Sequence, residues 1–149
     1  MSNVSADLIW EVSRLQNSYL VKTKTAQFSR DPLNLTNLHS RKFAGFVNDK
    51  AIGISANEKG GVKVISKKPA AVNKPASNLS AVTYGGNKTS RKTYRAVANQ
   101  AAKNGYRPDL RAAAVARASA IRRSQRPVKP EPEPKLRGNA AKKAAAAKQ

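Results

Sequence analysis

Positive charge is the feature that most constrains what this chain can fold into. The sequence carries 29 Lys and Arg residues against 8 Asp and Glu residues, which gives a formal net charge of +21 on 149 residues. Such a charge repels itself in a compact state unless a polyanion neutralises it. We therefore expect the chain to bind a phosphate backbone, with nucleic acid as the first candidate.

Composition also limits the core and the kinds of site that are possible. Aromatic residues make up only 5% of the chain and cysteine is absent, so we expect a small core and no disulfide framework, zinc ribbon or thiol nucleophile. The N-terminus lacks a basic leader followed by an apolar stretch, and no segment approaches the roughly 18 apolar residues of a membrane-spanning helix. We expect a soluble intracellular protein without a membrane partner.

The charge is distributed unevenly along the chain. Residues 1–64 carry 9 basic and 5 acidic residues, net +4, whereas residues 65–149 carry 20 basic and 3 acidic residues, net +17. The first part should hold most of the self-supporting fold and the second most of the polyanion contact. We expect an α+β fold with four segments: a small α+β domain (1–66), an extended basic linker (67–89), two basic helices (90–126) and a tail rich in Pro, Ala and Lys (127–149).

The first segment has the pattern of a small antiparallel sheet with one helix packed on it. Ser5 is a suitable N-cap for a helix whose apolar face holds Leu8, Ile9, Val12 and Leu15, with Trp10 in the core. Alternating side chains predict strands, and Asn, Asp and Gly suit the hairpin turns between them. The predicted strands are 19–24, 43–47, 50–55 and 62–66, with hairpin turns at 48–49 and 57–61 and an extended loop over 29–40.

The second half predicts a linker, two helices and a tail. Residues 67–80 contain two prolines and no periodicity, so we expect them to be disordered without a partner. Helical periodicity returns at Ser90 and should end at Asn104-Gly105. A second helix should run from Pro108 to about Gln125, and its narrow apolar stripe is Leu110, Ala114, Ala118 and Ile121. After it, residues 129–135 should be extended and residues 140–148 transiently helical.

The sequence offers little support for catalysis or metal binding. It has one histidine, and its carboxylates form no obvious pair or metal-ligand spacing. We expect His39 to have a structural role, and we expect no enzyme activity, cofactor, metal or small-molecule substrate. The stretch 85–89 lacks the spacing of a nucleotide-binding loop and is predicted to be a basic turn that touches a phosphate.

Basic residues are too dense around the two helices for the few acids to pair them. Arginine grips phosphate bidentately and stacks on bases, and Arg111, Arg122 and Arg126 fall within roughly 60° of each other at 100° per residue. Tyr94 and Tyr106 lie among the arginines, where each either packs in the core or stacks on an unpaired base. The predicted RNA-binding residues are Lys67, Lys68, Lys74, Lys88, Arg91, Lys92, Arg95, Arg107, Arg111, Arg117, Arg122, Arg123 and Arg126.

Several short motifs resemble one known family. The most specific is Tyr106-Arg107-Pro108-Asp109-Leu110-Arg111, and it is followed at the matching spacing by the runs 117–121 and 123–127. Together with the runs 7–10, 17–22 and 50–54, it resembles the L28e family of eukaryotic large-subunit ribosomal proteins over roughly residues 7–128. The resemblance implies a structural component of the cytoplasmic large subunit that binds large-subunit ribosomal RNA, contacts neighbouring ribosomal proteins and passes through the nucleolus during assembly. The tail after Val128 departs from the strongly basic ending of the family.

Other readings of the sequence are a ribosome-assembly factor and a chromatin protein. The related Mak-sixteen assembly factors resemble the same N-terminal domain but carry cysteines there and acidic extensions, which this chain lacks. A linker-histone-like protein would account for the tail rich in Lys, Ala and Pro. The 12 Arg residues, concentrated in the predicted helices, favour shaped RNA over duplex DNA. A basic amphipathic membrane binder is disfavoured because the apolar stripes are mostly alanine.

Overall fold

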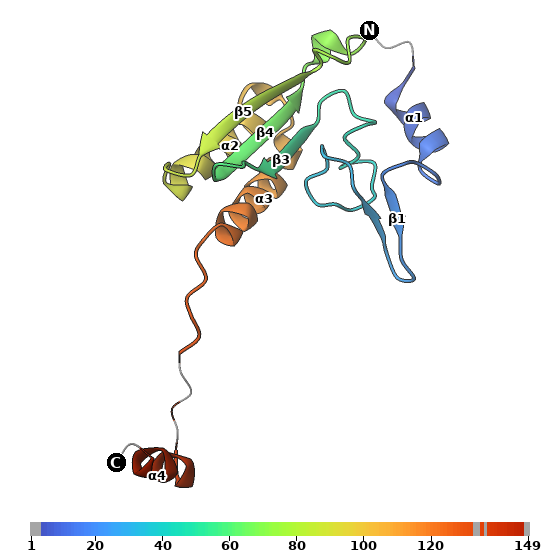
Figure 1. Cartoon of the computed structure of the whole chain (residues 1–149). Coiled ribbons are helices and arrows are strands. Elements are labelled where there is room, and N and C mark those ends of the chain that lie inside the picture. Colours follow the sequence, from blue (N-terminus) through green and yellow to red (C-terminus); the bar gives the residue numbers. More distant parts are fainter. Residues whose placement is uncertain (1–3, 133–134, 136, 148–149) are drawn as a thin grey trace.

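A three-stranded antiparallel sheet covered by two helices forms the centre of the molecule. The computed structural model describes residues 4–132, 135 and 137–147. The sheet has the order β3–β4–β5, and helices α2 and α3 cover one of its faces (Figure 1). This arrangement confirms the predicted α+β class. The elements are β3 (Ile52–Ala56), β4 (Gly61–Lys67), β5 (Leu79–Gly85), α2 (Ser90–Ala102) and α3 (Arg111–Ser124).

The hydrophobic core lies between this sheet and the two helices. Valine and isoleucine side chains from β3 and β4 meet alanines from α2 and α3, and the small alanines let the helices pack closely on the sheet. The predicted boundary between segments at residue 66 divides this core, because β3 and most of β4 precede that residue and α2 and α3 follow it. The buried members are Leu35, Ile52, Ile54, Val62, Val64, Val97, Ala101, Leu110, Ala114 and Ala118.

The β3–β4 hairpin confirms two predicted strands and the turn at 57–61. Asn57 N–H donates to the Gly61 carbonyl at 3.2 Å, which closes the turn. Gly60 and Gly61 have φ values of 78° and 94°, a region that favours glycine. A Cβ added to Gly61 would lie 2.1 Å from the Tyr84 carbonyl oxygen, so this glycine also lets β5 approach.

Strand β5 lies inside the stretch predicted to be an extended linker. It pairs with β4 from Lys67↔Leu79 to Gly61↔Gly85, and a short 3-10 turn, η1 (Pro69–Ala71), begins the connection between the two strands. Most β5 side chains are exposed, so their pattern carries little signal, and backbone pairing with β4 sets the strand. Residues 67–89 are therefore not a continuous linker.

The N-terminal region confirms the helix but corrects its packing. Helix α1 (Ala6–Ser13) is capped by the Ser5 hydroxyl, which accepts a hydrogen bond from Leu8 N–H at 3.2 Å. No α1 residue is buried, and Val12 is 76% exposed, so the expected packing of this helix on the sheet is wrong. Trp10 is half-buried outside the core, and its ring lies 4.9 Å from that of His39. A separate hairpin follows, with strands β1 (Leu20–Lys22) and β2 (Gln27–Ser29).

Residues 43–47, predicted to be a strand, form turns instead. Ala44 N–H donates to the Ser40 carbonyl at 2.9 Å, and Asn48 N–H donates to the Ala44 carbonyl at 3.3 Å. The buried carboxylate of Asp31 accepts a hydrogen bond from Phe46 N–H at 3.0 Å, which anchors these turns to the loop before them. Because residues 43–47 are not a strand, residues 48–49 do not close a hairpin.

The helical half follows the predicted boundaries. Helix α2 ends at the 3-10 turn η2 (Lys103–Gly105), where Asn104 and Gly105 have φ values of 63° and 62°. The turn η3 (Pro108–Leu110) leads into α3, whose predicted apolar stripe packs in the core. A final helix, α4 (Asn139–Ala146), lies apart from the other elements in Figure 1. Within the described ranges, no helix is long and apolar enough to cross a membrane.

Candidate nucleic-acid interface

The predicted RNA-binding residues divide into two groups with different surroundings. Four of them point their charged groups at backbone carbonyls of the protein itself: Lys67, Arg107, Arg117 and Arg122. The other nine are exposed, and their side chains make no hydrogen bond or ion pair within the described part of the chain: Lys68, Lys74, Lys88, Arg91, Lys92, Arg95, Arg111, Arg123 and Arg126.

Arg117 joins α3 to β3 and to the loop that precedes it. Its Nε donates to the Ile54 carbonyl at 2.9 Å, and its Nη1 donates to the Leu35 carbonyl at 3.2 Å and to Asn37 Oδ1 at 3.0 Å. Ile54 and Leu35 are buried, so few waters could replace the guanidinium at these carbonyls. Arg117 therefore holds α3 against β3 and the preceding loop, and its guanidinium donates within the protein itself.

Arg107 has a similar role at the start of η3. Its Nη1 donates to the Lys50 carbonyl at 2.7 Å and its Nη2 to the Lys42 carbonyl at 3.0 Å. The guanidinium also donates two hydrogen bonds of 2.8 Å to the carboxylate of Asp109. These bonds hold the pKa of Asp109 below its ordinary value. Arg107 thus holds the segment before β3 against the helical half.

Arg122 and Lys67 complete the inward group. Arg122 Nη2 donates to the Gly86 and Lys88 carbonyls at 3.0 and 3.1 Å, so the Gly-Gly turn predicted to touch phosphate is held by an arginine. Lys67 Nζ donates to the Asn48 carbonyl at 3.0 Å. Burial lowers the pKa of Lys67, and the nearby carboxylates of Asp31 and Asp49 oppose this shift. Both cations therefore donate to backbone carbonyls of the protein itself.

The exposed residues concentrate at one end of the helical pair. Arg122 on α3 reaches the turn before α2, and the Gln125 side chain is hydrogen-bonded to both the N–H and the carbonyl of Gly61, so the C-terminus of α3 lies beside the N-terminus of α2. The described residues of α2 and α3 include no acid, and Glu58 in the adjacent turn between β3 and β4 makes no ion pair within the described chain. We call the exposed cations here the helix-end cluster: Lys88, Arg91, Lys92, Arg95, Arg123 and Arg126.

The remaining three predicted residues lie elsewhere. Lys68 and Lys74 flank η1, at the opposite end of the sheet from the helix-end cluster. Arg111 begins α3 and Arg126 follows its end, so the two are separated by the whole helix, which rises about 1.5 Å per residue. Because Arg122 turns inward and Arg111 lies far from Arg126, the predicted three-arginine edge is not one surface.

The aromatic and histidine side chains have structural contacts. Tyr106 packs against the core, and its hydroxyl donates to the Lys67 carbonyl at 2.6 Å; burial raises the pKa of this phenol. Tyr94 also packs against the core. His39 Nε2 lies 2.8 Å from the Arg14 carbonyl, which agrees with its predicted structural role. Within the residues that the structure describes, no three carboxylates or histidines group as a metal site would require.

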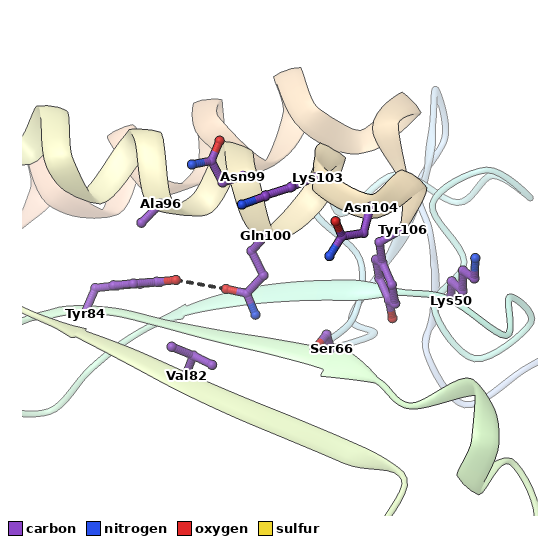
Figure 2. A pocket seen from close by; sticks show the side chains of 10 residues that line it. All are labelled: Lys50, Ser66, Val82, Tyr84, Ala96, Asn99, Gln100, Lys103, Asn104 and Tyr106. Atoms are coloured by element: carbon purple, nitrogen blue, oxygen red, sulfur yellow. Dashed lines mark hydrogen bonds between the residues drawn. The ribbon is translucent and has the colours of Figure 1, made fainter.

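Sequence reasoning missed a groove of about 570 Å³ between α2 and the sheet. Its helical wall comes from one side of α2 and from the turn after it (Figure 2). The opposite wall comes from β4, from β5 and from Lys50, two residues before β3. The sequence carries little signal for this groove because the lining residues are scattered between positions 50 and 106. They are Lys50, Ser66, Val82, Tyr84, Ala96, Asn99, Gln100, Lys103, Asn104 and Tyr106.

Comparisons with known proteins match nearly the whole folded part of the chain. Residues 8–124 match the model of the Ribosomal L28e protein family. A large ribosomal subunit protein eL28 from Schizosaccharomyces pombe is 45% identical over 131 residues, covering 85% of this chain and 97% of the relative. A protein of the same name from Dictyostelium discoideum is 32% identical over 126 residues, covering 85% of this chain and 92% of the relative.

Proposed function

Because this chain belongs to the ribosomal L28e protein family, we propose that it is a structural constituent of the large ribosomal subunit that binds ribosomal RNA through the helix-end cluster. Its role is to hold RNA in place and not to catalyse a reaction. Its partners are large-subunit ribosomal RNA and neighbouring ribosomal proteins. It works in the cytoplasm and passes through the nucleolus during assembly.

The observation that carries the RNA-binding part of the proposal is the split among the cations. The protein uses Arg107, Arg117 and Arg122 to hold its own loops together, and this use accounts for part of its high arginine content. The helix-end cluster has no such use, since its side chains are exposed and make no hydrogen bond or ion pair in the described chain; Lys88 alone lies near an aromatic ring, that of Tyr84. Six cations close together on one surface repel one another, and a bound polyanion would remove this repulsion and release counterions.

The arrangement of the helix-end cluster suits the phosphate backbone of a folded RNA. Arg91 and Arg95 are four residues apart on α2, so their side chains extend from one face. Arg123 and Arg126 come from the neighbouring end of α3, so two helices present cations to the same region. Arginine forks bind phosphate bidentately, and phosphate contacts fix register on the RNA.

Sedimentation of a cell extract tests the proposal. The tagged full-length protein should migrate with large subunits, 80S ribosomes and polysomes in a sucrose gradient, and stay with large subunits after polysomes are dissociated. Migration only with nuclear pre-ribosomal particles would identify an assembly factor instead. Sedimentation with chromatin, or only as free protein, would contradict the proposal.

A further inference from the structure

The groove beneath α2 has the chemistry of a site for a single nucleotide. Tyr84 and Tyr106 lie on either side of Gln100, which points from the helix toward the sheet (Figure 2). Its volume, about 570 Å³, falls within the range of roughly 300–1,000 Å³ that is typical of small-ligand sites. No member of the helix-end cluster lines the groove, and only Lys88 borders it, at the Tyr84 end. Phosphate binding by that cluster therefore does not account for the amides and for Tyr106.

Three amides in the groove have unused hydrogen-bonding groups. Gln100 Oε1 accepts a hydrogen bond from the Tyr84 hydroxyl at 3.1 Å, which leaves the amide N–H groups of Gln100 without an acceptor in the described chain. The side chains of Asn99 and Asn104 make no hydrogen bond within the described residues and are exposed. A side-chain amide offers a donor and an acceptor next to each other, which matches the edge of an unpaired base.

The two tyrosines are held in place by their hydroxyl groups. Tyr106 donates to the Lys67 carbonyl at 2.6 Å and Tyr84 donates to Gln100, so both rings are fixed before any ligand arrives. A fixed aromatic ring loses little conformational entropy when a base stacks on it. The rings therefore give the groove two preformed apolar walls.

Charge around the groove favours an anionic ligand. Lys50 Nζ lies 5.9 Å from the centre of the Tyr106 ring, and Lys88 Nζ lies 5.7 Å from the centre of the Tyr84 ring. Lys103 also lines the groove, and none of the lining residues is acidic. Cations beside aromatic and amide groups would receive the phosphate of a nucleotide while its base is inside.

We propose that this groove binds an unpaired ribonucleotide of the RNA partner, with the base between Tyr84 and Tyr106 and its edge on the Asn and Gln amides. The inference rests on the proposed function, because it takes the bound polyanion to be RNA. A base paired within a duplex has its edge occupied and its faces stacked, so the groove selects a bulged or looped nucleotide. The phosphates on either side are bound by Lys50 and Lys103.

Binding measurements with two RNAs test the groove. The full chain is titrated with a single-stranded oligoribonucleotide and with an RNA duplex that offers the same number of phosphates. The variant N99A/Q100A/N104G removes the three amides while keeping residues that suit the helix and the positive φ at position 104. It should bind the single strand about tenfold or more weakly, with the duplex affinity and the salt dependence unchanged.

Controls separate a local effect from a loss of fold. The variant Q16A/N73A removes one Gln and one Asn amide at exposed positions outside the groove, and it should bind both RNAs like the wild type. The variant N99A/N104G breaks no internal hydrogen bond and should show a smaller loss in the same direction as the triple variant. An equal loss on both RNAs, or none on the single strand, would overturn the groove assignment.

A cross-linking experiment distinguishes RNA from protein as the occupant. A photoreactive residue at position 82, which lines the groove but not the neighbouring hollow beside Lys88 and Lys92, is introduced into the full chain, and large subunits are irradiated. Cross-links to RNA support the proposal, whereas cross-links to a neighbouring protein would contradict it. If the wild-type chain binds neither RNA in solution and is absent from large subunits, the proposed function itself fails.

Discussion

Replacing Arg117 should destabilise the protein, although its sequence context suggests a phosphate ligand. Arg117→Met keeps the length and the apolar stem of the side chain but removes the donors to the Ile54 and Leu35 carbonyls and to Asn37 Oδ1. Hydrogen bonds from a charged group contribute about 1.5–3 kcal/mol each, and leaving a buried carbonyl unsatisfied costs about 1–3 kcal/mol. Solvent reaches part of this site, so we expect a loss of about 2–4 kcal/mol in the free energy of unfolding.

The matched control is Arg123→Met on the same helix. The Arg123 side chain is exposed and makes no hydrogen bond or ion pair among the described residues, so its replacement should change the free energy of unfolding by less than about 0.5 kcal/mol. It should instead lower the slope of log affinity against log salt for RNA by up to about one. The two variants carry the same change of charge, so a difference in stability reports the internal contacts of Arg117.

Thermal and urea unfolding of the full chain, followed by circular dichroism, measure the difference. For a chain of this size, a loss of about 2–4 kcal/mol lowers Tm by roughly 5–15 °C. The reasoning is refuted if Arg117→Met unfolds at the same temperature as Arg123→Met. It is also refuted if Arg117→Met keeps full stability while losing as much of the salt slope as the control.

Three further changes test other parts of the fold. Gly61→Ala places a Cβ 2.1 Å from the Tyr84 carbonyl oxygen and should lower the free energy of unfolding by more than about 3 kcal/mol. Gly105→Ala, also at positive φ but with open space around it, should lower it by about 1–2 kcal/mol. Equal urea midpoints for the two variants would contradict the clash at Gly61. Ala118→Leu overfills the fully buried contact of α3 with the sheet and should lower stability by at least about 1–3 kcal/mol, and an unchanged Tm would show that the contact is loose. The Arg107 guanidinium holds the pKa of Asp109 below its ordinary value, so this ion pair stabilises the fold above the unfolded-state pKa, and the stabilisation is lost as pH falls through the folded-state pKa. Asp109→Asn should therefore be less stable than wild type at neutral pH and equally stable in strong acid. A difference in stability that persists in acid would contradict this origin.

The helical half of the fold was predictable because its signals are local. Asn104-Gly105 ends one helix, Pro108 starts the next, and the apolar stripe of α3 has helical spacing. The β3–β4 hairpin was predictable for the same reason, since glycines mark its turn. Local signals failed at residues 43–47, where a buried carboxylate at Asp31 anchors turns in an apolar stretch.

Tertiary pairing explains the other errors. Strand β5 follows proline-rich residues and exposes most of its side chains, so its pairing with β4 leaves little trace in its sequence. Helix α1 has an apolar face, yet Val12 is exposed, because periodicity shows that a face exists and not what covers it.

Arginine roles were the least predictable part of the candidate site. A guanidinium that binds a backbone carbonyl and one that binds a phosphate need the same donors, so Arg117 and Arg123 have the same appearance in the sequence. The shortage of Asp and Glu showed that many Lys and Arg side chains must bind groups other than carboxylates. It did not show which cations find those partners inside the fold. The groove was missed because its amides and tyrosines come together only when α2 packs on the sheet.

The most direct test of the account is a structure of the large subunit with this chain bound. We predict that cations of the helix-end cluster lie within about 4 Å of RNA phosphate oxygens. In the same structure, Arg107, Arg117 and Arg122 should keep the carbonyl partners that they have in the free chain. A bound chain whose helix-end cluster faces solvent, with RNA contacting other surfaces, would contradict the central claim.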